Sequence, residues 1–169
     1  MTITPTADPL AHLDAQFDHD LARMLDTQLE FEPELWWQGP HTAERVPCWS
    51  VAFAMDLIGV VDCREGDFPF VVLGDVRSER WMQVCGTPEV GYLVELGNVE
   101  RDTNTMGIVG RPGGYTGGDT RVTITGTEHS VTCRSRQVLT VGEARFAFSS
   151  WVVDGKLPLT DFWVEYVTY

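Results

Sequence analysis

The chain has 169 residues, 43% of them hydrophobic, so it is long enough for one compact domain and too short for two of ordinary size. Its 25 acidic and 12 basic residues give a net charge of −13. A surface this acidic repels nucleic-acid phosphates and anionic membranes, so neither is expected as a direct partner. The eight Phe, six Trp and four Tyr argue against general disorder, because they can supply a core.

The first residues have neither the basic nor the apolar region of a signal peptide, so we expect a cytoplasmic protein. The cysteines lack the spacing of a zinc site or a redox motif; they are Cys48, Cys63, Cys85 and Cys133. Four reduced thiols fit a reducing cytoplasm. Two disulfides in an exported domain remain an alternative, because the number of cysteines is even.

Residues 8–30 have the pattern of an amphipathic helix, with an apolar stripe formed by Leu10, Leu13, Phe17, Leu21, Met24 and Leu25. An irregular connection is expected over residues 33–48, which contain Trp36, Trp37 and three prolines. The net charge is −10 over residues 1–67, so this part of the chain sets the negative field. Residues 1–48 are therefore expected to form an acidic helical segment that packs on or extends a domain of residues 49–169.

From residue 49 the pattern changes to short apolar runs separated by turn residues, which indicates a meandering antiparallel sheet. The expected strands are Ser50–Ile58, Phe68–Leu73, Arg80–Cys85, Tyr92–Leu96, Met106–Val109, Arg121–Thr125, Ser130–Leu139 and Phe162–Tyr169. The glycine-rich run Gly110–Gly118 lacks the Gly-Lys-Ser/Thr ending of a phosphate loop, so we expect a flexible connection there.

A second helix is expected over Val141–Val153, where apolar residues recur at helical spacing. Thr140 and Glu143 have the spacing of a capping box at its start, and Asp154-Gly155 ends it. The expected fold is α+β: a mostly antiparallel sheet of about six to eight strands, with an N-terminal amphipathic helix and a C-terminal helix packed on it.

No motif for chemistry stands out from the background. The four histidines, at positions 12, 19, 41 and 129, lack metal-ligand spacing, and the many carboxylate pairs are those that 25 acidic residues produce by chance. We therefore predict no catalytic, cofactor-binding or metal-binding residues and do not expect an enzyme. A cleft that joins His129 to two carboxylates would favour a hydrolase or transferase instead.

The C-terminal third resembles the end of the Imm1 family of bacterial immunity proteins, which close with a strand, a helix containing Glu-Ala, a Gly-x-x-Pro turn and a strand carrying Trp. The matching segments are Leu139–Arg145, Trp151–Pro158 and Phe162–Glu165, with looser likeness at Phe70–Gly74, Trp81–Gly86 and Gly91–Val94. The resemblance covers residues 68–166. The matched residues have scaffold roles: Glu143 caps the helix, Ala144 permits close packing of helix on sheet, Gly155 turns the chain, Pro158 leads into the last strand, and Trp163 anchors that strand in the core.

This resemblance implies a cytoplasmic antidote that binds and inhibits a cognate bacterial toxin. Toxins of such systems include deaminases that act on nucleic acids, and their basic surfaces suit an acidic inhibitor. Candidate contacts combine aromatic anchors with loop carboxylates; they are Trp36, Trp37, Asp62, Glu65 and Asp67. The alternative is a small-molecule-binding domain with an apolar pocket between sheet and helix.

Overall fold

The computed structural model describes residues 35–38, 46–48, 50–64, 69–75, 80–98, 105–112, 120–125, 130–154, 157–158 and 160–168. The helix expected over residues 8–30 lies outside these ranges, as does most of the glycine-rich connection Gly110–Gly118.

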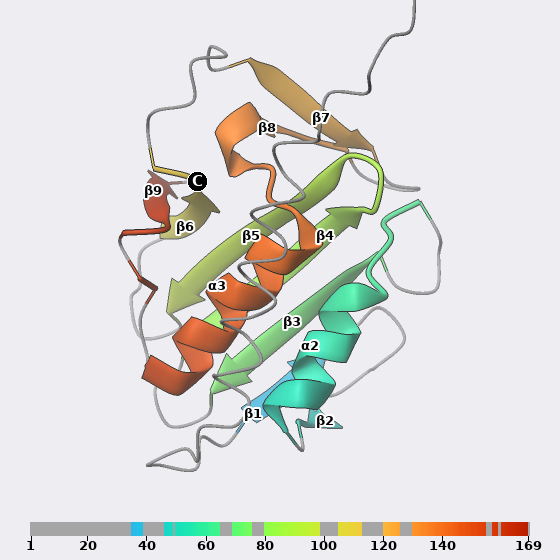
Figure 1. Cartoon of the computed structure of the whole chain (residues 1–169), viewed down its shortest axis with the longest axis vertical. Helices are drawn as coiled ribbons and strands as arrows, with labels where there is room; N and C mark the ends of the chain where they lie inside the picture. Colours follow the sequence, from blue (N-terminus) through green and yellow to red (C-terminus); the bar gives the residue numbers. More distant parts are fainter. Residues whose placement is uncertain are drawn as a thin grey trace, which may run out of the picture.

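Seven strands form one sheet in the order β2-β1-β3-β4-β5-β6-β9, and each neighbouring pair is antiparallel (Figure 1). Their bounds are β1 Leu35–Gln38, β2 Val46–Pro47, β3 Phe70–Asp75, β4 Arg80–Thr87, β5 Gly91–Asn98, β6 Thr105–Gly110 and β9 Trp163–Thr168. A separate hairpin pairs β7 (Arg121–Thr125) with β8 (Ser130–Arg134). The mostly antiparallel α+β fold is therefore confirmed.

Helices α2 (Val51–Gly59) and α3 (Val141–Asp154) lie across one face of this sheet, here called the helix face (Figure 1). Strand alternation places every second apolar residue on that face, and six of these are buried there: Val71, Leu73, Met82, Val84, Tyr92 and Val94. Ala144 and Ala147 of α3 are fully buried in the same cluster. Their small side chains let the helix pack closely on the strands.

The opposite face, here called the hairpin face, is partly covered by β7 and β8. A second apolar cluster lies between this hairpin and the sheet. Its buried members are Cys63, Leu93, Ile124, Cys133 and Val138, and Cys85, Ile108 and Val122 pack against them. Beyond β8 the chain makes a single 3-10 turn, η1 (Ser135–Gln137). Leu139 then bridges Tyr92 beside β5, so the chain crosses from the hairpin face to the helix face just before α3.

The strand expected over Ser50–Ile58 is wrong, because this segment is helix α2. Ser50 caps the helix by accepting a hydrogen bond from the backbone N–H of Phe53 at 3.1 Å. Its buried residues are Ala54, Met55, Leu57 and Ile58, a helical spacing. The segment is apolar enough that a period of two and a period of 3.6 both fit it.

The irregular connection expected over residues 33–48 is also wrong, because two strands, β1 and β2, occupy part of it. In β1, Trp36 pairs with Gly74 of β3 on one side and Pro47 of β2 on the other. β1 is therefore an inner strand of the sheet. The strand expected over Ser130–Leu139 is shorter than predicted, since β8 ends at Arg134 and η1 follows.

Candidate partner-binding surface

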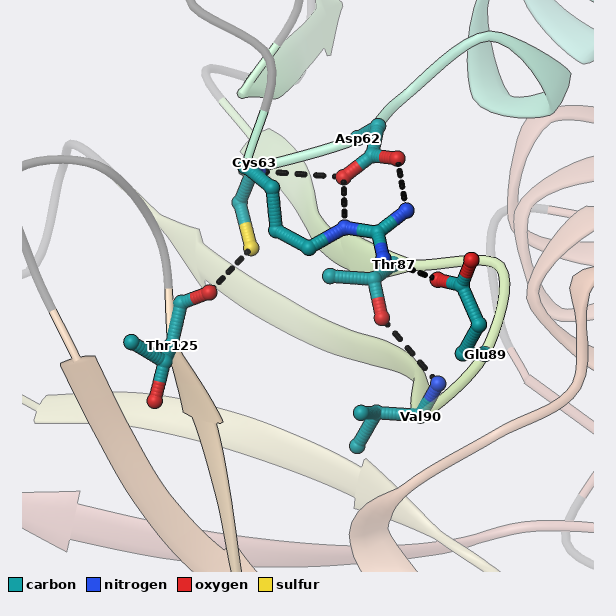
Figure 2. Close-up of polar contacts among 7 residues, drawn as sticks. Asp62, Cys63, Thr87, Glu89, Val90 and Thr125 are labelled. Atoms are coloured by element: carbon teal, nitrogen blue, oxygen red, sulfur yellow. Dashed lines mark hydrogen bonds and ion pairs between the residues drawn. The ribbon is translucent and has the colours of Figure 1, made fainter.

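The loop after α2 and the tight turn between β4 and β5 meet at one end of the sheet. The backbone N–H of Cys63 donates to the carbonyl of Gly86 at 2.8 Å, which holds the loop against β4. Within the turn, the N–H of Val90 donates to Oγ1 of Thr87 at 3.0 Å (Figure 2). Gly91 closes the turn with φ +111°, a conformation that favours glycine. The two segments therefore have a fixed relative position.

Arg64 joins two carboxylates across this junction. Its Nε and Nη2 donate to Oδ1 and Oδ2 of Asp62 at 3.0 and 2.6 Å, and its Nη1 lies 2.7 Å from Oε2 of Glu89. The backbone N–H of Arg64 also donates to Asp62 Oδ1 at 3.0 Å. Figure 2 shows Asp62 and Glu89 on either side of the guanidinium. The three side chains form a charge triad that carries one net negative charge.

The triad is a surface feature. The side chains of Glu89 and Arg64 are 62% and 46% exposed, and that of Asp62 is 13% exposed. The hydrogen bonds from Arg64 lower the pKa of Asp62 below its ordinary value. The carboxylates likewise raise the pKa of Arg64. Asp62 is therefore ionised at neutral pH, and the triad contributes little to stability because solvent screens it.

Two exposed aliphatic side chains belong to the same two segments. Val60, at the end of α2, is 58% exposed, and Val90, in the β4–β5 turn, is 43% exposed. Together with the triad they form what we call the α2–turn surface, made of Val60, Asp62, Arg64, Glu89 and Val90. Protein interfaces usually have an apolar core surrounded by a polar rim, and the valines and the triad could supply one part of each.

Of the five predicted contact residues, the structure places Asp62 in this surface. Glu65 and Asp67 lie outside the described residues. Trp36 and Trp37 belong to β1, and Trp36 pairs with Pro47 just before α2, whereas Asp62 follows the other end of that helix. The tryptophans are therefore not brought together with Asp62. Sequence reasoning missed the other four residues of the surface. The sequence feature that could have indicated Arg64 is its position two residues after Asp62 in a loop.

A second Arg–carboxylate cluster lies at the start of α3, and we call it the α3 polar centre. The predicted capping box is confirmed: the N–H of Thr140 donates to Glu143 Oε2 at 2.7 Å, and the N–H of Glu143 donates to Thr140 Oγ1 at 3.2 Å. Arg111, which follows β6, adds a two-point ion pair to the Glu143 carboxylate, with Nε 2.6 Å from Oε1. Glu143 is buried and Arg111 nearly so.

Of the other predicted scaffold residues, Ala144 lies in α3, Pro158 precedes β9 and Trp163 begins it. Ala144 is fully buried, as expected, and the carbonyl of Pro158 accepts hydrogen bonds from the N–H groups of Asp161 and Phe162 just before β9. Phe162 is the buried aromatic of this segment. Trp163, expected to anchor the strand in the core, is only partly buried and lies beneath the guanidinium of Arg136 at 4.3 Å. Gly155 lies outside the described residues.

All four cysteines lie within the described residues and are free thiols. Three of them belong to the cluster on the hairpin face. Burial raises the pKa of Cys63 and Cys133, and it raises the pKa of Cys85 to about 12. These thiols therefore remain protonated at neutral pH, which makes them packing residues rather than nucleophiles.

Within the described ranges, no group of three or more His, Cys, Asp or Glu side chains is placed to hold a metal ion. None of the helices in the described part of the chain is long and apolar enough to cross a membrane. No protein-family model matches the chain, and neither a curated protein nor a solved structure matches it.

Proposed function

We propose that this protein is a bacterial immunity protein that binds a cognate toxin and inhibits it stoichiometrically, as its resemblance to the Imm1 family implies. The observation that carries the proposal is the α2–turn surface, which combines exposed valines with a net-negative triad on a chain of net charge −13. A toxin that acts on nucleic acids needs a basic surface to hold phosphates, and this surface is complementary to it.

Electrostatics and packing have different roles in this mechanism. The field of the acidic chain speeds the encounter with a basic toxin, and the fixed carboxylates set the orientation. The exposed side chains of Val60 and Val90 then exclude water from the contact. A stable interface buries about 1,600 Å² in total, so residues beyond the five of the α2–turn surface also contribute. The bound protein blocks the entry of nucleic acid into the toxin.

Arg64 prepares this surface for binding. It holds the carboxylates of Asp62 and Glu89 within hydrogen-bond distance of one guanidinium, which restricts their side-chain freedom before the partner arrives. A pre-organised carboxylate loses less entropy when it pairs with a Lys or Arg of the toxin. The partner side chains that fit here are therefore basic ones that approach Glu89, the more exposed of the two carboxylates.

The direct experiment mixes the purified protein with the toxin encoded by the neighbouring gene. The readouts are nucleic-acid deamination or cleavage by the toxin, and the stoichiometry of the complex. We expect activity to disappear at an equimolar ratio and a one-to-one complex to form. If an equimolar or larger amount leaves the toxin fully active, the proposal is wrong.

A charge reversal tests the α2–turn surface itself. Glu89→Lys is expected to weaken toxin binding by about 10-fold or more, because it replaces an attractive contact with a repulsive one. Asp161→Lys is the matched control, since it makes the same charge change at an exposed aspartate before β9. Equal weakening by both variants would mean that only net charge matters and that binding occurs elsewhere.

A further inference from the structure

The two edges of the seven-stranded sheet differ in how they are protected. β2 is an edge of two residues and ends in Pro47, which lacks a backbone N–H. β9 is an edge of six residues, and among the described residues it pairs with β6 alone. In an antiparallel strand, alternate residues direct their N–H and C=O groups to each side. The outer side of β9 therefore offers backbone groups that can pair with another strand.

The side chains of β9 do not protect this edge with an unpaired charge. Its sequence, WVEYVT, contains one charged residue, Glu165. Oε1 of Glu165 lies 3.2 Å from Nη2 of Arg134, and Oε2 accepts a hydrogen bond from Gln137 at 2.9 Å. These partners, from β8 and η1, hold the carboxylate on the hairpin face and neutralise it. The carboxylate of Glu165 is therefore not a free charge for a strand that approaches β9.

Tyr166 lies on the other side of the strand from Glu165 and is 67% exposed, the largest exposed fraction among the large apolar side chains of the described residues. A tyrosine this exposed in the middle of an edge strand gains contact area when a second strand is added. Cross-strand aromatic pairs contribute to sheet stability beyond that area.

We propose that β9 pairs antiparallel with β9 of a second copy of this chain, about a two-fold axis at Tyr166, so that the two sheets become continuous. In this register Tyr166 lies opposite its own copy, and Glu165 lies opposite Val167 of the second copy. The two neutralised glutamates therefore never face each other, which removes the like-charge contact that would oppose pairing. An identical strand is self-complementary in this arrangement, as a two-fold interface requires.

Salt dependence separates this dimer from binding to a basic protein. Two chains of net charge −13 repel each other at long range, whereas the β9 contacts act at short range. Raising NaCl from 0.1 to 1 M shortens the screening length from about 10 to about 3 Å. The dimer is therefore expected to strengthen with salt, and a complex with a basic toxin to weaken. This inference does not depend on the proposed function.

The experiment is sedimentation or light scattering of the full chain from about 5 to 500 µM, a range suited to micromolar association. The expected mass rises from 18.9 kDa toward twice that value, and more so at 1 M NaCl. Tyr166→Lys is expected to lower the association constant at least 10-fold, because it places like charges opposite each other. Val131→Lys, at a 37% exposed position on β8, is the control and should change it less than 2-fold.

A charge-complementation test addresses the two-fold pairing. Tyr166→Lys and Tyr166→Glu should each be monomeric, and their mixture should restore a dimer. Hydrogen exchange of unmodified protein gives a readout that needs no variant, because dimerisation should protect β9 amides in proportion to concentration. A chain that stays monomeric at every concentration and salt level, a dimer that tolerates Tyr166→Lys, or a mixture that fails to dimerise would each overturn the proposal.

Discussion

Two arginines of the described residues, Arg64 and Arg111, bind a carboxylate through two nitrogens of the guanidinium, and their surroundings are opposite. In the α3 polar centre, the Arg111 and Glu143 side chains are 14% and 3% exposed. In the α2–turn surface, Arg64 is 46% exposed and also reaches Glu89, which is 62% exposed. The two-point geometry is the same in both places.

This contrast shows that burial, and not the pairing chemistry, decides what such a cluster does. Both charges of the α3 polar centre are removed from water, so each depends on the other and on the capping box of Thr140. In the α2–turn surface Arg64 and Glu89 remain hydrated, although Asp62 is 13% exposed, so the pairing of Arg64 with Glu89 is readily exchanged for pairing with another molecule. The first cluster fixes the start of α3, and the second is available to a partner.

The largest effect is expected when the buried cluster is broken. Glu143→Ala removes the carboxylate that binds Arg111 at two points and also removes the cap, so we expect a loss of about 3–5 kcal/mol in the free energy of unfolding. Urea unfolding measures it. Glu143→Gln keeps the capping geometry without the charge and should lose less. A loss below about 1 kcal/mol for Glu143→Ala would mean that this buried ion pair stabilises the protein no more than a surface pair does.

Glu95 sharpens the comparison, because it is buried like Glu143 but its carboxylate accepts a hydrogen bond from an amide, Gln83 Nε2 at 3.2 Å. Burial raises the pKa of Glu95 above its ordinary value of 4.5. The folded state then binds a proton more tightly than the unfolded state, so this residue lowers stability as pH rises from the ordinary pKa through the raised one.

Glu95→Gln removes the buried charge while keeping the shape. We expect it to stabilise the protein by on the order of 1 kcal/mol at pH 8 and to have little effect at pH 4. Urea unfolding of both proteins across this range gives the difference in stability at each pH. A substitution that destabilises the protein equally at both pH values would mean that the charge of Glu95 is not the cause.

A smaller effect is expected at the exposed cluster. Arg64→Ala removes the ion pairs with Asp62 and Glu89, yet we expect only a small change in the free energy of unfolding, because solvent screens these charges. The same urea titration used for Glu143→Ala measures it, so the two numbers are directly comparable. A loss as large as that of Glu143→Ala would show that the α2–turn surface is part of the structural framework.

The smallest effect concerns the titration of Asp62. Its pKa is lowered mainly by the hydrogen bonds from Arg64, so the stabilisation is present above the ordinary pKa of 3.8 and is lost as pH falls through the lowered value. An NMR titration of the Asp62 carboxyl should show this lowered pKa, and Arg64→Ala should move it back toward 3.8. An unchanged pKa in the variant would assign the shift to another cause.

The parts of the fold that follow local rules were predictable. The strands β3 to β6 and β9 follow alternation and turn residues, and α3 begins at a capping box within four residues of sequence. β1 was not predictable, because all four of its residues pair with β3, more than thirty residues away, and its pairing with β2 covers two of them. α2 was missed since nearly every residue from Val51 to Ile58 is apolar, which hides the period.

The candidate site was likewise predictable only where it depends on residues that are close in sequence. Asp62 was found because a carboxylate in a loop of an acidic chain is a reasonable contact. Glu89 was not found, because its contact with Arg64 depends on how the loop after α2 meets the β4–β5 turn. Arg111 was missed for the same reason: the capping role of Glu143 can be inferred from neighbouring residues, whereas its ion partner follows β6, about thirty residues earlier in the chain.

The pairing of β6 with β9 has a consequence for the order of assembly. β4 and β5 join through the turn Pro88–Val90, but Gly110 of β6 pairs with Trp163, roughly fifty residues later. Closing so long a loop costs more chain entropy than forming a hairpin, so the β4–β5 ladder should be made before the rate-limiting barrier and the β6–β9 ladder after it. Weakening β9 should then hasten unfolding while leaving the refolding rate nearly unchanged.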